Sequence, residues 1–166
     1  MTVKAKALPT TVVQMPQAAP CRGGDLMSER FKVSVPNERS SPRREDACRV
    51  GVMRRIAAAR LRYCGLEAMR HDVLLIVSEL LTNALQHSGT TEISLVITVD
   101  HGVLRVRVRD GMPGVAGLRR PGDSSESGRG LWLVDTLVTE SGGNWGTCDG
   151  GAEIWCCLPL PTQGQQ

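Results

Sequence analysis

The sequence predicts an α/β (α+β) sandwich of two layers, in which helices cover one face of a mainly antiparallel sheet. Segments with the period of a helix and segments with the period of a strand come in blocks, and this order favours antiparallel pairing with the helices on one side. A chain of 166 residues with 41% hydrophobic residues can build one core of ordinary size. Because only 3% of the residues are aromatic, we expect that core to be aliphatic.

Composition excludes several classes of protein. The aliphatic share rules out a disordered polymer, and 18 glycines with 9 prolines rule out a coiled coil. No apolar run approaches the roughly 18 to 20 residues that span a bilayer, and Pro16 lies among glutamines that interrupt any signal-peptide core. We therefore expect a cytoplasmic protein without membrane contact. A net charge of +3 is too small to indicate a nucleic-acid partner.

The six cysteines show no spacing typical of metal ligands. In a reducing compartment the simplest expectation is that they are buried free thiols.

The chain is expected to divide into a tail, one domain and a short end. Residues 1–28 hold prolines, glutamines and glycines without an apolar period, which predicts a flexible tail. The folded domain is expected over residues 29–160, and residues 161–166 are expected to be a disordered C-terminus.

Apolar periodicity predicts the secondary structure inside this domain. Alternation of apolar and polar residues indicates strands, spacings of three and four indicate helices, and Gly, Pro and Asp mark their ends. The expected elements are a strand at 31–35, helices at 43–63 and 67–87, strands at 92–99 and 103–110, a helix at 130–140, and strands at 143–147 and 153–158. The loop at 111–128 holds five glycines and two prolines, and loops of this length are usually functional or disordered.

The second helix carries the first candidate site. Its apolar residues cover one broad arc, and Glu79 and Asn83 lie one turn apart at the edge of that arc. A carboxylate in this position can accept a proton, and an amide oxygen one turn away can hold a magnesium ion that also binds phosphates. Taken alone, the pair is more typical of a solvent-facing helix surface than of a functional site.

Two further segments are candidates for contact with a ligand. Asp110 ends a strand, where its carboxylate can accept a hydrogen bond from an exocyclic amine such as that of adenine, although an ordinary Asp-Gly turn is the alternative. Gly128, Arg129 and Gly130 open a helix, whose free N–H groups suit phosphate oxygens. The chain has no P-loop motif, and no strand leads directly into this GxG as a dinucleotide fold requires.

In their order along the chain, these motifs resemble the Bergerat-type ATP-binding fold of the GHKL superfamily, which includes gyrase B, histidine kinases and MutL. The motif ExxxNAxxHS, which begins at Glu79, is followed by the strand-end Asp110, a glycine-rich loop and the GxG. The resemblance covers about residues 30–160. Residues 77–84 (VSELLTNA) are similar in particular to those of the small anti-sigma-factor serine/threonine kinases of the RsbW and SpoIIAB group, a form common among actinobacterial regulators.

The resemblance implies ATP and Mg²⁺ as cofactors and assigns a role to each candidate residue. Glu79 would be the catalytic general base, Asn83 the magnesium ligand and Asp110 the acceptor for the adenine amino group. Gly114 would shape the adenine pocket, with residues 115–127 as a lid. The residues that would hold the phosphates are Gly128, Arg129, Gly130 and Leu131.

Two positions depart from the family's pattern. Met112 stands where the first loop of the family, DxGxG, has its middle glycine. Glu153 stands where we expect the last strand of the family to carry a threonine near adenine. Both bear on adenine affinity, and neither removes the Glu79–Asn83 pair or the GxG.

The resemblance implies a serine/threonine protein kinase that regulates transcription. Its partners would be a sigma factor, held inactive, and a STAS-type anti-anti-sigma protein, which it phosphorylates; a homodimer is a further expectation, because small members of the group commonly dimerise. The alternative is a non-catalytic regulator that binds nucleotide and partner through a degenerate site. A histidine-kinase catalytic module is disfavoured, because His71 and Asp72 lie on the same helix as Glu79.

Other side chains are expected to be structural. Arg105, Arg107 and Arg109 alternate along one strand, which is typical of an exposed sheet face, with a partner surface as the alternative. Trp132 and Trp155 are expected in the core.

Overall fold

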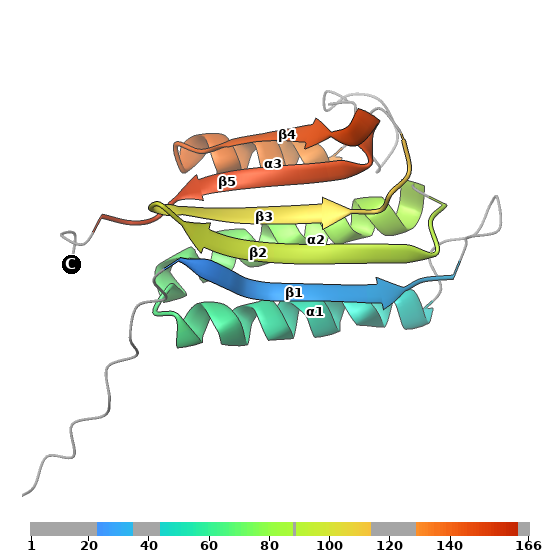
Figure 1. Ribbon diagram of the computed structural model, residues 1–166, viewed down its shortest axis with the longest axis horizontal. Helices are drawn as coiled ribbons and strands as arrows, with labels where there is room; N and C mark the ends of the chain where they lie inside the picture. Colours follow the sequence, from blue (N-terminus) through green and yellow to red (C-terminus); the bar gives the residue numbers. More distant parts are fainter. Residues whose placement is uncertain (1–22, 35–43, 88, 114–128, 163–166) are drawn as a thin grey trace, which may run out of the picture.

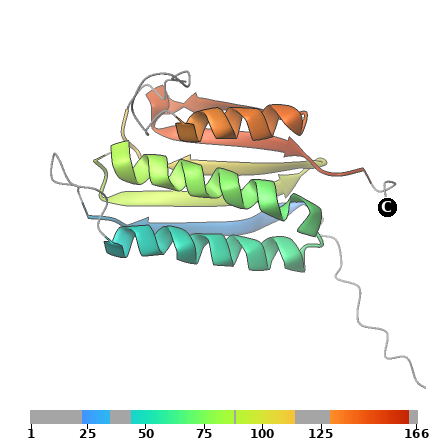
Figure 2. The ribbon, with the colours of Figure 1, turned by 180° about the vertical axis from the view of Figure 1, so that it is seen from behind.

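Five antiparallel strands form one sheet in the order β1-β2-β3-β5-β4, and three helices cover one of its faces (Figures 1 and 2). The computed structural model describes residues 23–34, 44–87, 89–113 and 129–162. The expected class, an α/β sandwich with helices on one face of an antiparallel sheet, is confirmed. None of the helices within these ranges is both long and apolar enough to cross a membrane.

The elements follow the expected order along the chain. The strands are β1 (Gly24–Lys32), β2 (Glu92–Asp100), β3 (Val103–Arg109), β4 (Asn144–Cys148) and β5 (Glu153–Pro159). The helices are α1 (Arg44–Tyr63), α2 (Arg70–His87) and α3 (Arg129–Glu140), with short 3-10 turns at Glu67–Met69 and Asp149–Gly151. The single helix expected over 67–87 therefore begins as a 3-10 turn and continues as α2.

The first strand differs from the expectation. It was expected at 31–35, and it begins at Gly24, inside the segment expected to be a tail. It pairs with β2 along its length, from Gly24 opposite Val99 to Lys32 opposite Glu92, and its register shifts between Asp25 and Met27. That irregularity leaves the neighbours Leu26 and Met27 both buried, which hides the period of two on which strand prediction depends.

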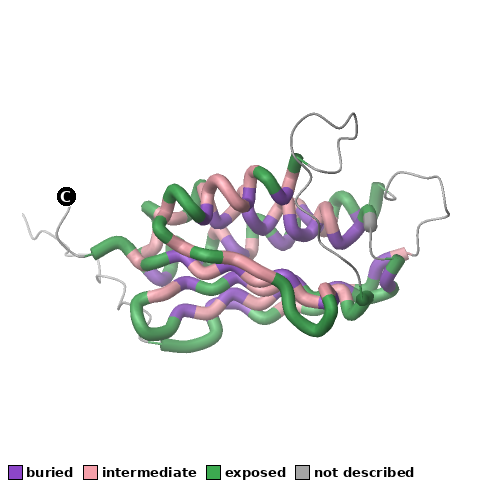
Figure 3. Tube along the Cα trace, turned by 90° about the horizontal axis from the view of Figure 1, so that it is seen from above, coloured by how far each residue is buried: buried purple, intermediate pink, exposed green. Residues whose placement is uncertain are grey.

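The core lies between the two layers and is aliphatic, as expected. The buried residues of the sheet and of the helices face one another in Figure 3. Strand β2 alternates with Ile93, Leu95 and Ile97 fully buried, and α2 contributes Ile76 and Leu80. This burial fixes which face of each strand, and which side of α2, can reach a ligand.

The tryptophans and cysteines depart from the expected placement. Trp132 is 46% exposed, and Trp155 is half-buried on the sheet face that carries no helix. Among the cysteines, Cys48 and Cys148 are exposed free thiols, and Cys64 is disulfide-bonded. Cys156 fits the expectation, since it is a buried thiol whose pKa is raised by burial to about 12.

One end of the molecule gathers the segments that carry the motifs. The C-terminal end of α2, the end of β3, the start of α3 and the turn between β4 and β5 all lie there, on the right in Figure 1. Helix α2 packs against both α1 and α3. Residues of the second helix, the strand end and the start of α3 are therefore brought together from distant parts of the sequence.

Candidate functional site

The carboxylate of Glu79 lies directly against the backbone of Gly130, the second residue of α3. A Cβ atom placed on Gly130 would lie 2.5 Å from Glu79 Oε2 and 3.5 Å from its Cδ. A contact of 2.5 Å is far shorter than a van der Waals contact, so any larger residue at position 130 would displace this carboxylate. Glycine is needed here for space, and the result is a carboxylate at the N-terminal end of α3.

Packing of α2 sets the position of Glu79 and Asn83. The buried arc of this helix faces the sheet, and Glu79 and Asn83 are both half-buried beside it. Residues four apart are rotated by about 40°, so the two side chains lie on the same side of α2, one above the other. The amide of Asn83 therefore lies one turn beyond the carboxylate that meets α3.

The strand-end Asp110 is held by backbone hydrogen bonds. Its N–H donates to the carbonyl oxygen of Ala152 (3.1 Å), and the N–H of Gly111 donates to the same oxygen (3.2 Å). The N–H of Met112 donates to Asp110 Oδ1 (2.9 Å). Gly111 has a φ of 71°, a left-handed conformation that suits glycine. The Asp-Gly turn expected as the alternative is thus present, and it uses Oδ1, so a ligand amine would be accepted by Oδ2.

Burial also affects the pKa of the Asp110 carboxyl group. Partial burial raises the pKa of Asp110 above its ordinary value, and the hydrogen bond from Met112 and the nearby charge of Arg109 oppose this in part. The half-buried carboxylate gains from any donor that replaces lost water. An exocyclic amine is such a donor.

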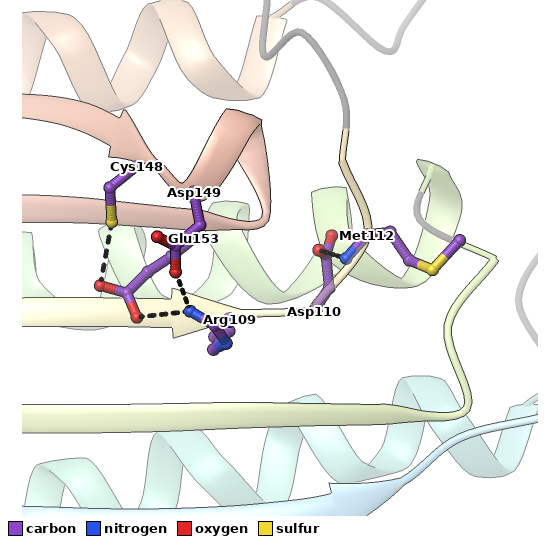
Figure 4. A network of polar contacts seen from close by, with 6 residues as sticks. All are labelled: Arg109, Asp110, Met112, Cys148, Asp149 and Glu153. Atoms are coloured by element: carbon purple, nitrogen blue, oxygen red, sulfur yellow. Dashed lines mark hydrogen bonds and ion pairs between the residues drawn. The ribbon is translucent and has the colours of Figure 1, made fainter.

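An ion-pair network joins the end of β3 to the turn between β4 and β5 (Figure 4). The guanidinium of Arg109 is hydrogen-bonded to Asp149 and lies 3.9 Å from Glu153 Oε2. The thiol of Cys148 donates to Glu153 Oε1 at 3.4 Å. The hydrogen bond to Asp149 is the main reason why the pKa of Arg109 is raised. This network holds the turn, and with it Ala152, next to Asp110.

Glu153 lies elsewhere than the sequence suggests. It pairs with Arg109 across β3 and β5, on the face of the sheet away from the helices, while the next residue, Ile154, is buried. The residue that meets Asp110 is the buried Ala152, one position earlier. A shift of one residue along a strand moves a side chain to the opposite face, so Glu153 does not stand beside the strand-end carboxylate.

The remaining predicted residues fall into three groups. Leu131 is 5% exposed, so its side chain belongs to the core and only its backbone can face a ligand. Arg129 and Met112 are exposed. Gly114, Gly128 and the segment 115–127 lie outside the described residues. Sequence reasoning missed Ala152 and Asp149, and it placed Arg109 on an exposed sheet face without a role near Asp110. The alternation of β5, counted back from the buried Ile154, is the signal that would have identified Ala152.

Together, the polar groups of this site suit a nucleotide with a divalent cation. The first turn of α3, a helix of 12 residues, offers free N–H groups to phosphate oxygens, and Gly130 adds no side chain at its own position in that turn. The amide oxygen of Asn83 is a hard ligand of the kind that Mg²⁺ prefers, and the carboxylate of Glu79 can accept a proton. Asp110 offers the acceptor for an exocyclic amine.

One of the comparisons with known proteins, the match to a family model, identifies the family of this chain. A family model described as "Histidine kinase-like ATPase domain" matches residues 44–156. Among solved structures, the chain is similar to the histidine kinase domain from Erythrobacter litoralis EL346 blue-light activated histidine kinase, with 24% sequence identity and a TM-score of 0.46. That match covers 67% of this chain and 61% of the other, so this chain spans about three fifths of its length. No match was found among the curated proteins.

Proposed function

Because this chain belongs to the histidine kinase-like ATPase family, whose domains bind ATP, we propose that it is a protein serine/threonine kinase that uses Mg-ATP. The observation that carries the proposal is the Glu79 carboxylate against Gly130. It places a proton acceptor beside the helix end best suited to phosphates. A module that only senses nucleotide has no need of a carboxylate at that point.

Different residues would bind different parts of the nucleotide. Asp110 would accept the adenine amino group, the first-turn N–H groups of α3 would hold phosphate oxygens, and Asn83 would hold Mg²⁺. When bound, ATP supplies the phosphoryl group that is transferred.

Glu79 would act on the acceptor. It takes the proton from a serine or threonine hydroxyl of the partner, which leaves that oxygen a stronger nucleophile. Because Gly130 leaves room for the carboxylate and the buried arc of α2 holds the helix in place, the base is positioned before the partner arrives.

The partners that we propose are a sigma factor and a STAS-type anti-anti-sigma protein, with the latter as phosphoacceptor. This rests on the similarity of residues 77–84 to the anti-sigma-factor kinases. A homodimer is part of the same proposal, since small members of that group commonly dimerise.

One observation favours a second candidate, a regulator that binds nucleotide and partner without catalysis. Met112 replaces the middle glycine of the first loop, and its side chain is 43% exposed. Glu153 no longer supports this candidate, because it pairs with Arg109 on the opposite face of the sheet.

The test is phosphoryl transfer from Mg-ATP to a panel of purified STAS-domain proteins, measured beside ATP binding. We expect Glu79→Gln to keep ATP affinity within about threefold and to lower transfer by about 10² to 10⁴, the usual contribution of a general base. Glu140→Gln, which removes an exposed carboxylate at the far end of α3, is the matched control and should leave both unchanged. ATP binding with no transfer to any panel member would favour the non-catalytic regulator.

A further inference from the structure

A hollow lined by basic residues lies on the face of the sheet that carries no helix. Figure 1 views the molecule from this side. The hollow has a volume of about 240 Å³ and is lined by Arg105, Arg107, Glu153, Trp155 and Cys157. We call it the basic hollow. It lies across the sheet from the helical layer, and so from Glu79 and the start of α3.

Strand register arranges these side chains in rows. Arg105 lies opposite Cys157, Arg107 opposite Trp155, and Arg109 opposite Glu153. The residues between the arginines are buried in the core, so the three guanidinium groups share the outer face, with attachment points about 7 Å apart along β3.

Two of these three guanidinium groups, those of Arg105 and Arg107, make no ion pair within 4.0 Å in the described part of the chain. Arg109 is paired with Asp149 and Glu153, and Arg30, on the same face, is paired with Glu92 at 3.5 Å. These ion pairs neutralise the charges of Arg109 and Arg30.

Arg105 and Arg107 are in a different situation. The Nε of Arg105 donates to the sulfur of Cys157 at 3.3 Å, and a thiol is only a weak acceptor. The Nε of Arg107 is buried and, within the described ranges, has no hydrogen-bond partner. Packing therefore holds the Arg107 side chain in place without an ion pair to satisfy it.

Trp155 lies beside this pair of charges. Its indole covers Gly146 so closely that a Cβ atom there would lie 2.9 Å from Trp155 Cζ2. Because residue 146 is a glycine, the ring can lie close against β4, and Trp155 stays half-exposed. Tryptophan and arginine held in this way are the residue types that supply most binding energy at protein interfaces.

The size and charge of the hollow limit the kind of group that can bind there. At about 240 Å³ it is smaller than the roughly 300 to 1,000 Å³ of sites that enclose small molecules, and it suits one or two side chains of a larger partner. A carboxylate matches a guanidinium in charge and in its two-pronged hydrogen bonding.

We propose that the basic hollow docks an acidic segment of a partner protein. One Asp or Glu side chain of that segment lies between Arg105 and Arg107, and an apolar neighbour packs against Trp155. Because the surface is on the opposite side of the sheet from Glu79, docking there does not depend on the proposed kinase activity.

The experiment uses the full chain and a fluorescein-labelled peptide of sequence EELEEL, with QQLQQL as the uncharged probe, followed by anisotropy. We expect EELEEL to bind at least tenfold more tightly than QQLQQL, and Arg105→Gln and Arg107→Gln each to weaken that binding at least tenfold. Arg54→Gln, which removes an exposed charge on α1, should change it less than twofold. Affinity for ATP should be the same in all three variants, which separates this result from the nucleotide site.

Four results would overturn the proposal. An equal loss in Arg54→Gln would show general charge attraction. Displacement of the peptide by inorganic phosphate at equal concentration would show a plain anion site, and tighter binding of a single-stranded oligonucleotide would show a nucleic-acid surface. Self-association that Arg105→Gln abolishes, without peptide binding, would show an interface between two copies of this chain. Thermal unfolding of each variant checks that the fold is intact.

Discussion

The Oε2 atom of Glu79 occupies the place where a side chain at position 130 would have to begin. A Cβ atom on Gly130 would lie 2.5 Å from it. Helix α2 presents the carboxylate, and helix α3 presents N–H groups to phosphates. The two helices therefore come into close contact at a single glycine. This contact links the ExxxN motif to the GxG, which are about 50 residues apart in the sequence.

Replacing that glycine should separate catalysis from binding. In Gly130→Ala the new methyl group pushes the flexible end of Glu79 away from α3 while the backbone of α3 keeps its N–H groups. We expect phosphoryl transfer to fall by about 10 to 100-fold, since a displacement of 1 Å can cost that much, and ATP affinity to change less than fivefold. Turnover and calorimetric affinity, measured on the same preparation, check this.

Gly51→Ala is the matched control. Gly51 lies within α1, and a Cβ atom there would meet nothing within 4 Å. We expect transfer to be unchanged and the free energy of unfolding to rise by about 0.5 to 1 kcal/mol, because alanine favours a helix interior over glycine. A loss of transfer in both variants would mean that the Glu79–Gly130 contact is not the cause.

The ion pair between Arg109 and Asp149 should matter more for affinity than for stability. Asp149 has a φ of 52°, which asparagine tolerates, so Asp149→Asn removes the charge without straining the turn. The turn then holds Ala152 less firmly against Asp110, and we expect ATP affinity to fall about threefold to tenfold. The free energy of unfolding should change little, because the pair is exposed to solvent, which screens it.

An exposed ion pair elsewhere on the sheet supplies the comparison for Asp149→Asn. Glu92→Gln breaks the pair with Arg30 and touches neither Ala152 nor Asp110. ATP affinity should remain as in the native chain. Equal losses in the two variants would contradict a positioning role for Arg109 and Asp149.

The raised pKa of Asp110 predicts how stability depends on pH. A carboxyl group whose pKa is higher in the folded state than in the unfolded state destabilises the fold when ionised, and this cost disappears as pH falls through both values. Asp110→Asn should therefore be more stable than the native chain at pH 7, with a gap that narrows as pH falls toward the ordinary aspartate pKa. Urea unfolding at pH 7 and pH 4.5 tests this, and a gap that widens on acidification would contradict it.

Strong local patterns explain what could be predicted from the sequence. Strand β2 alternates without interruption, and α2 places its apolar residues on one arc, so both elements and the Glu79–Asn83 pair were found. Strand β1 was placed too late in the chain, because the register shift between Asp25 and Met27 breaks the alternation.

The sequence predictions that were wrong at the site concern strand register and close contacts between different elements. Alternation counted back from the buried Ile154 places Ala152, and not Glu153, on the core face, but that Ala152 meets Asp110 depends on how β5 pairs with β3. Trp155 was expected in the core, and it lies on the outer face because its neighbours Ile154 and Cys156 face the core; Gly146, on a different strand, leaves room for the indole. The contact of Gly130 with Glu79 likewise depends on how α3 packs against α2.

Titration of Mg-ATP into the full chain and into Asn83→Ala, followed by calorimetry, tests the account most directly. We expect the native chain to bind ATP in a Mg²⁺-dependent manner, and Asn83→Ala to lose at least tenfold in affinity with Mg²⁺ while losing little without it. Gln86→Ala, an exposed residue on the same helix, should bind as the native chain does. No binding to the native chain at millimolar ATP, or equal affinities in the native chain and Asn83→Ala, would contradict the assignment of this site.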